Sequence, residues 1–332
     1  MHELAYPLLV GLVILALAFD FLNGLHDAAN SIATVVTTRL LSPVNAVLFA
    51  AFGNFAAYWL VGLHVAETVG KGIINKDMVT PAVVFGALVG AMFWNVVTWL
   101  KGIPSSSSHA LIGGLLGAGI AHGGFAAVES SGTTKTIIAI FLSPTIGFVL
   151  AMAMMLLTSW LFRGFQPRRA EGVFKSLHLV SSAAYSISHG GNDAQKTMGI
   201  ITVLLYSTGQ LKGEFHVPEW VVIACYLAIS MGTLSGGWKI IKTMGSKLTK
   251  LNHHTGFCAS TAGSLVVFGA SALGIPVSTT HAITGSGVGT GAARKASAVR
   301  WGVAGRVVIA WFITIPASAA VGALFYTLTR MF

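Results

Sequence analysis

This sequence of 332 residues contains very little charge. Only 9% of its residues are Asp, Glu, Lys or Arg, whereas 54% are hydrophobic. A soluble protein of this length needs far more charge to cover its surface, so the shortage excludes a soluble globular protein. The composition instead predicts an integral membrane protein with the lipid bilayer around it.

Cysteine and acidic residues are also scarce. Cys225 and Cys258 lie in apolar stretches without a paired spacing, which indicates neither a disulfide nor a metal site. Lys and Arg outnumber Asp and Glu by 20 to 10, but they gather between the apolar runs, so no nucleic acid is expected as a partner. The first apolar run is preceded by Glu3 where a signal peptide has basic residues, contains Asp20, and lacks a small-residue cleavage site. We therefore expect a retained helix there rather than a signal peptide.

Long apolar runs and glycine are what the sequence has in abundance. Its 39 glycines suit closely packed transmembrane helices and broken segments. The predicted fold class is an all-α polytopic membrane protein. Runs long enough to span a bilayer lie at Ala5–Leu22, Val44–Ala66, Pro81–Leu100, Thr136–Phe162, Val217–Trp238, Gly256–Leu273 and Gly302–Leu328.

Two pairs of matching segments indicate an internal duplication. The string IPSSSSHALIGGLLGAG from Ile103 returns as IPVSTTHAITGSGVGTG from Ile275, and NGLHDAANSIA from Asn23 matches HGGNDAQKTMG from His189. Duplicated units of membrane proteins are commonly related by inverted topology. We therefore expect two inverted repeats that together form one membrane domain. The first covers 1–165 with a hairpin at about 81–121, and the second covers 170–332 with a hairpin at about 254–291.

The charges of equivalent loops favour the inverted arrangement. The segment His122–Lys135 carries Glu129 and Lys135, whereas the charged residues of its counterpart Ala292–Arg306 are all basic. By the positive-inside rule the two loops lie on opposite sides of the membrane, and the same reasoning places both termini outside. Both flanks of each polar string then lie on one side, so we expect two re-entrant helical hairpins, with two full spans each as the alternative.

The polar strings carry runs of hydroxyl side chains followed by a histidine. Each run precedes a helix that we expect to begin at Ala110 or Ala282. Hydroxyls, free amides and the positive end of a helix predict an anion site without a fixed positive charge. A polar loop is the alternative for a lone serine run. His109 and His281 are candidates to contact the anion, to carry protons or to cap the helix.

Ionisable residues within the predicted membrane segments mark a candidate pathway. Asp27 and Asp193 occupy matched positions of the two repeats, whereas Asp20 is matched by the uncharged Ser186. The alternative is an internal ion pair that only fastens helices. Hard carboxylate and amide oxygens suit an alkali cation or a proton better than a transition metal. An anion site together with two matched acids predicts cation-coupled anion symport.

With these residues in view, the chain resembles the PiT family of inorganic phosphate transporters, particularly its short bacterial low-affinity branch. The resemblance rests on DFLNGLHDAANSIATV from Asp20, IPSSSSHALIGGLLGAG from Ile103, SHGGNDAQKTMGI from Ser188 and IPVSTTHAITGSGVGTG from Ile275. It implies inverted repeats with two re-entrant hairpins and both termini outside. It also implies phosphate uptake across the cell inner membrane, driven by protons or sodium, with no cofactor beyond this coupling ion.

The resemblance further implies roles for individual residues. The hairpin hydroxyls would bind phosphate, and they are Ser106, Ser107, Ser108, Ser278, Thr279 and Thr280. The coupling-ion positions would be Asp27, Asp193, Asn30 and Asn192. Candidates for a proton relay or for charge balance are His26, His189, Lys196, His109 and His281.

Two departures from the family pattern bear on the coupling ion. His26 stands where many members have Asn, and Lys196 stands at the position matched by Asn30. A histidine and a fixed ammonium at these positions argue against a symmetric pair of sodium sites. The resemblance to the short bacterial branch implies protons as the coupling ion, with a metal–phosphate complex as a candidate substrate. The alternatives are a sulfate permease, an uncoupled anion channel, and an intramembrane enzyme with Ser108 or Thr280 as nucleophile, although neither hydroxyl run includes an acid to orient a base. A homodimer is a candidate assembly.

Overall fold

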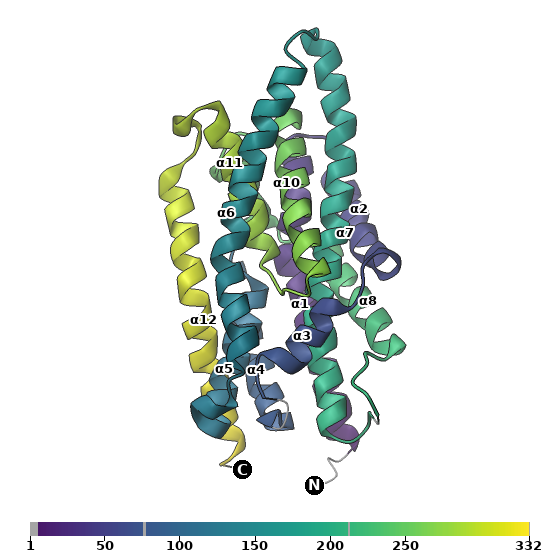
Figure 1. The fold of residues 1–332 in the computed structure, drawn as a ribbon, viewed down its shortest axis with the longest axis vertical. Helices are drawn as coiled ribbons and strands as arrows, with labels where there is room; N and C mark the ends of the chain where they lie inside the picture. The colour runs from purple at the N-terminus through teal and green to yellow at the C-terminus, as the bar shows by residue number, and fades with distance from the viewer. Residues whose placement is uncertain (1–5, 76–77, 212, 332) are drawn as a thin grey trace.

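A computed structural model describes residues 6–75, 78–211 and 213–331, which form a bundle of helices (Figure 1). The helices are α1 (Tyr6–Thr37), α2 (Pro43–Leu60), α3 (His64–Gly72), α4 (Pro81–Lys101), α5 (Ser107–Gly123), α6 (Ser130–Leu161), α7 (Pro167–Ser207), α8 (Glu219–Ser235), α9 (Trp238–Lys242), α10 (His253–Ala272), α11 (Thr279–Arg294) and α12 (Trp301–Thr329). Short helical turns lie at Gly124–Ala127, Thr243–Lys247 and Ala296–Ala298. Within the described ranges β-structure is limited to two isolated bridges, Ile74 with Val128 and Thr249 with Val299.

Most of the long helices are suited to a bilayer. Seven described helices are long and apolar enough to cross a membrane, namely α1, α2, α4, α5 with the turn after it, α6, α10 and α12. Large apolar side chains such as Phe52, Phe141 and Phe312 are exposed on the outside of the bundle. The chain is therefore an all-α, multi-pass membrane protein, as the composition predicted.

Two helices differ from the predicted spans. The first span was expected to end at Leu22, but α1 continues to Thr37. The whole of α7 falls on a segment for which no span was predicted. Hydropathy misled in both places because the middle of each helix carries polar side chains that are buried inside the bundle, where they do not contact lipid.

Each half of the chain contributes a helical hairpin, formed by α4 with α5 and by α10 with α11. The first arms are followed by Gly102 and Gly274, whose φ angles of 62° and 66° are strained for residues that have a Cβ. Ser106 and Ser278 cap the second arms, because each side-chain oxygen accepts a hydrogen bond at 3.2 Å from a backbone N–H three residues later. The two turns therefore have matching chemistry.

The second arms begin earlier than the sequence indicated. The predicted starts were Ala110 and Ala282, whereas α5 begins at Ser107 and α11 at Thr279. The serine caps explain this difference, since they bring the last hydroxyls of each run into the first helical turn. These hydroxyls thus lie beside the free N–H groups of the helix N-terminus.

Each hairpin packs against the closing helix of the other half. The arm α5 lies on α12, and α11 lies on α6. A Cβ on Gly117 would collide with the carbonyl of Ala319, and a Cβ on Gly289 would collide with that of Phe148. Such close backbone contacts are typical of small residues between membrane helices.

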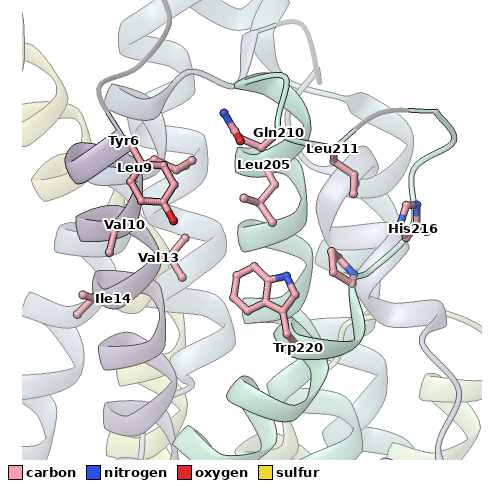
Figure 2. Close-up of a pocket in the computed structure, with 11 residues that line it drawn as sticks. Tyr6, Leu9, Val10, Val13, Ile14, Leu205, Gln210, Leu211, His216 and Trp220 are labelled. Carbon is pink, nitrogen blue, oxygen red and sulfur yellow. The ribbon is translucent and has the colours of Figure 1, made fainter.

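The two ends of the bundle differ. The first turn of α1 and the last turn of α12 lie at one end, and the connection from α6 to α7 lies at the opposite end (Figure 1). A largely apolar pocket opens near the end that carries the termini, with Val13, Leu205 and Trp220 of α1, α7 and α8 around it (Figure 2). The polar centre of the protein lies deeper, between the two hairpin tips.

Candidate functional site

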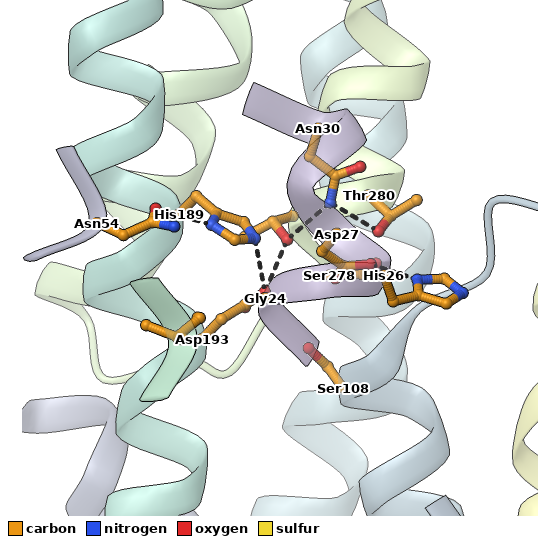
Figure 3. A network of polar contacts seen from close by, with 12 residues as sticks. Gly24, His26, Asp27, Asn30, Asn54, Ser108, His189, Asp193, Ser278 and Thr280 are labelled. Atoms are coloured by element: carbon orange, nitrogen blue, oxygen red, sulfur yellow. Dashed lines mark hydrogen bonds and ion pairs between the residues drawn. The ribbon is translucent and has the colours of Figure 1, made fainter. Parts of the chain in front are cut away.

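The centre of the bundle gathers buried polar side chains from α1, α7 and both hairpin tips (Figure 3). None of the site residues proposed from the sequence is more than 3% exposed. Because α1 and α7 are continuous helices here, their backbone groups are already hydrogen bonded, and only their side chains face the tips. Contacts link all four segments.

Lys196 joins the second acid to both hairpin tips. Its ammonium donates hydrogen bonds to Asp193 and to the Ser108 hydroxyl of the first tip. It also donates to the Val277 carbonyl of the second tip at 2.8 Å. The expectation of an anion site without a fixed positive charge is therefore wrong, because the long side chain of Lys196 reaches from α7 to the hydroxyls.

Asp193 has further partners. Its Oδ2 accepts a hydrogen bond from the Thr279 hydroxyl at 3.0 Å and lies 3.3 Å from His189 Nε2. The other ring nitrogen of His189 lies 3.1 Å from the Asn54 amide oxygen (Figure 3). A fixed ammonium, a hydroxyl and an oriented imidazole thus surround Asp193, so its charge is compensated within the protein.

Asp27 has a different environment. Its Oδ1 lies 2.7 Å from Nδ1 of the neighbouring His26. The far nitrogen of His26 lies 3.0 Å from the Thr98 hydroxyl and 3.4 Å from the Ser105 hydroxyl, both in the first hairpin. Among the described residues no Lys or Arg forms an ion pair with Asp27. The partner of this acid is thus an imidazole and not a fixed cation.

The matched residues Asn30 and Lys196 each cross to the hairpin of the other half. The Asn30 amide donates to Thr280 at 2.9 Å and to Thr279 at 3.4 Å, as Lys196 donates to Ser108. Asn192, expected near the coupling ion, instead donates to Ser271 in its own hairpin at 2.9 Å. The amide groups of the site therefore orient the hairpins.

The two acids come close to one another. Asp27, His189 and Asp193 each offer a ligand atom, and these atoms lie within 4.8 Å of one another. His189 matches Asn23 in the repeat, so nothing in the sequence indicated that this imidazole lies close to Asp27. Since Lys196 already compensates Asp193, the remaining negative charge suits one small monovalent cation or a proton.

The two histidines that follow the hydroxyl runs meet each other. The ring centroids of His109 and His281 are 4.3 Å apart in an edge-to-face arrangement. His281 also stacks on Trp311 of α12, with 3.7 Å between the centroids. Neither nitrogen of His109 has a hydrogen-bond partner among the described residues. These rings form a direct contact between the hairpins, beside the hydrogen bond that the Ser108 hydroxyl donates to the Val277 carbonyl at 3.4 Å.

Several residues of the network were not proposed from the sequence. Thr98 and Ser105 hold His26, Asn54 holds His189, and the Tyr185 hydroxyl donates to the Thr279 carbonyl at 2.8 Å. Ser105 belongs to the serine run and could have been found there. The others lie far from the motifs in sequence, and only the fold brings them to the site.

The arrangement is suited to a small oxyanion. Hydroxyls of Ser107, Ser108 and Thr280, the Lys196 ammonium and the N-termini of α5 and α11 all lie at the junction of the tips. Ser107 Oγ is buried and has no hydrogen-bond partner among the described residues. Donors of this kind bind phosphate or sulfate oxygens.

Known proteins resemble this chain over most of its length. The model of the Phosphate transporter family matches residues 23–322. A probable low-affinity inorganic phosphate transporter of Rhizobium meliloti is 62% identical over 323 residues, 97% of each chain. One of Bacillus subtilis with the same description is 44% identical over 327 residues, 96% of each chain.

A solved structure has the same fold. Its title is "The sodium-dependent phosphate transporter", and it superposes with a TM-score of 0.90 at 26% identity. The match covers 98% of this chain and 99% of the other.

Proposed function

The chain belongs to the phosphate transporter family, and we propose that it imports inorganic phosphate by symport with protons. Members of this family are transporters and not enzymes, which removes the intramembrane enzyme from consideration. The proposed location is the cell inner membrane with both termini outside. The proposed transport domain consists of two inverted repeats, 1–165 and 170–332, each with a re-entrant hairpin.

One observation carries the proposed substrate site. Lys196 bonds to the Ser108 hydroxyl of one hairpin tip and to the Val277 carbonyl of the other. A phosphate that displaced these contacts would receive an ammonium and hydroxyls from both tips at once. Because the donors come from both halves, a relative movement of the halves would dismantle the site and release the anion.

The charges of the two acids support protons as the coupling ion. The solved relative is titled a sodium-dependent transporter, but a sodium ion at Asp193 would here meet the ammonium of Lys196. Asp27 is paired with His26, and an imidazole next to a carboxylate can accept or pass a proton. One proton at this pair would balance part of the charge of the phosphate during transport.

Counterflow in proteoliposomes tests the substrate. Vesicles loaded with unlabelled phosphate are expected to take up labelled phosphate transiently, and excess sulfate outside is expected to leave this uptake unchanged. Competition by sulfate as strong as that by phosphate would favour the sulfate permease. A current that follows the phosphate gradient with no dependence on a proton or sodium gradient would favour the channel.

The proposed assembly is a homodimer. The detergent-solubilised protein is then expected to have the mass of two chains.

A further inference from the structure

Asp20 lies in α1 close to the candidate site but takes no part in its hydrogen bonds. Its side chain is 0% exposed, and neither carboxylate oxygen has a hydrogen-bond partner among the described residues. A buried carboxylate without a partner is strongly disfavoured relative to one in water. Asp20 therefore requires a proton or another cation to neutralise it.

The groups beside Asp20 are oxygen atoms that also lack partners. Asn23 and Thr197 lie next to the carboxylate without completing a hydrogen bond to it. Asn23 Oδ1 and Thr197 Oγ1 are buried and unpartnered in the described part of the chain, and so is the hydroxyl of Tyr226 on the neighbouring α8. The phenol of Tyr226 lies close enough to Asp20 for a charge interaction between the two side chains. Amide, hydroxyl and carboxylate oxygens are hard ligands, which suit small cations.

The other ionisable groups that face Asp20 leave its charge uncompensated. They are Asp193 and Lys196 on α7, and Cys225 and Tyr226 on α8. The ammonium of Lys196 is already bonded to Asp193 and to both hairpin tips. Since this ammonium compensates Asp193, the carboxylate of Asp20 is the charge left without a partner.

Asp20 lies between the polar centre and the end of the bundle that carries the termini. It precedes Asp27 on α1 by about 10 Å of helix axis, at 1.5 Å per residue. The three helices around Asp20 also line the pocket at that end through Val13, Leu205 and Trp220 (Figure 2). A cation that entered along these helices would reach Asp20 before Asp27.

The second half of the chain has no counterpart of this acid. The matched residue is Ser186, whose hydroxyl donates to the Ser182 carbonyl of its own helix at 3.0 Å. An acid present in only one half can bind a cation on only one side of the substrate site. Ser186 also supplies a matched position for a control.

We propose that Asp20, Asn23 and Thr197 form a site for one small monovalent cation, a proton or a sodium ion, on the terminal side of the phosphate site. This proposal rests on the proposed symport. It adds a second cation to the transport cycle, separate from the one proposed at the matched acids. Its occupation couples phosphate import to a further positive charge.

The test measures two phosphate fluxes in proteoliposomes containing wild type, D20N, D20S, D20E or the control S186A. Wild type, D20E and S186A are expected to show both counterflow and accumulation driven by an imposed gradient. D20N and D20S are expected to keep counterflow, because the site is permanently neutral, and to lose most of the accumulation. Proton and sodium gradients imposed separately identify the cation whose driving force is lost.

The remaining outcomes overturn the proposal. Accumulation in D20N and D20S equal to that of wild type would mean that no coupled cation binds at Asp20. Loss of counterflow, or of monodisperse protein, in both neutral variants would assign Asp20 a structural role. Absence of phosphate counterflow in wild type would instead contradict the proposed function, so the two failures are distinguishable.

Discussion

Asp27 and Asp193 occupy matched positions in the two halves, yet the protein surrounds them differently. Asp193 contacts the ammonium of Lys196, the Thr279 hydroxyl and His189. Asp27 contacts the imidazole of His26, and no fixed cation of the described chain pairs with it. The two matched segments therefore carry an acid at the same position but differ in the partners of that acid. We infer that the acid of the second half organises the anion site, whereas the acid of the first half binds the coupling cation.

The largest expected effect comes from breaking the compensated pair. D193N leaves the buried Lys196 without its carboxylate, and removing one partner of a buried ion pair costs about 3–5 kcal/mol. We expect D193N to lose uptake and to lower the free energy of unfolding by that order, measured as a fall in the thermal midpoint in detergent. The double variant D193N/K196N, which removes both charges, is expected to recover most of the stability. A D193N protein as stable as wild type would contradict the role of this pair.

D27N tests the other acid. No fixed cation is stranded by this change, so stability is expected to fall by less than about 3 kcal/mol, the range for hydrogen bonds to a charged group. Gradient-driven uptake is expected to fall to background because the neutral side chain cannot bind the coupling cation. Uptake and thermal midpoint are measured on the same preparation. Normal gradient-driven uptake in D27N would refute the coupling role of Asp27.

K196N makes the second half resemble the first, which has Asn30 at this position. A hydrogen bond to a charged group contributes about 1.5–3 kcal/mol. Loss of the ammonium is therefore expected to raise the KM for phosphate by about 10–100-fold. N30A is the matched control, and its expected increase is smaller because an amide carries no charge. Equal KM values for K196N and wild type would show that the ammonium of Lys196 does not bind the substrate.

The smallest effects are expected for the hydroxyls of the tips. S108A and T280A each remove one neutral donor, so we expect the KM for phosphate to rise by about two- to tenfold. S108A is expected to have the larger effect, since Ser108 also contacts Lys196. The control is T145A, because Thr145 lies exposed on α6 and bonds only to the Phe141 carbonyl of its own helix. Effects no larger than that of T145A would exclude both hydroxyls from the site.

The sequence was informative wherever the physical signal was local. Apolar runs predicted most spans, and the serine runs with their glycines marked both hairpin turns. It failed for α7, because a helix that buries polar side chains from Ser186 to Thr197 does not have the hydropathy of a span that faces lipid. Only the match with the segment from Asn23 hinted that this stretch is the counterpart of α1.

The sequence indicated which polar residues are buried together, but it did not indicate their contacts. Every proposed residue is buried at the centre, but the pairings of Asn30 with Thr280 and of Lys196 with Ser108 join segments far apart in sequence. Such pairs depend on how the hairpins cross between the halves, which no local pattern encodes. The reach of Lys196 to the hydroxyls, and hence the fixed charge at the anion site, could not be derived from its position alone.

Gradient-driven phosphate uptake into proteoliposomes, with proton and sodium gradients imposed separately, tests the central claim most directly. An inward proton gradient is expected to drive accumulation of labelled phosphate against its own gradient, in wild type but not in D27N. A sodium gradient at equal pH on both sides is expected to drive none. Accumulation driven by sodium alone, or accumulation in D27N as large as in wild type, would contradict the account.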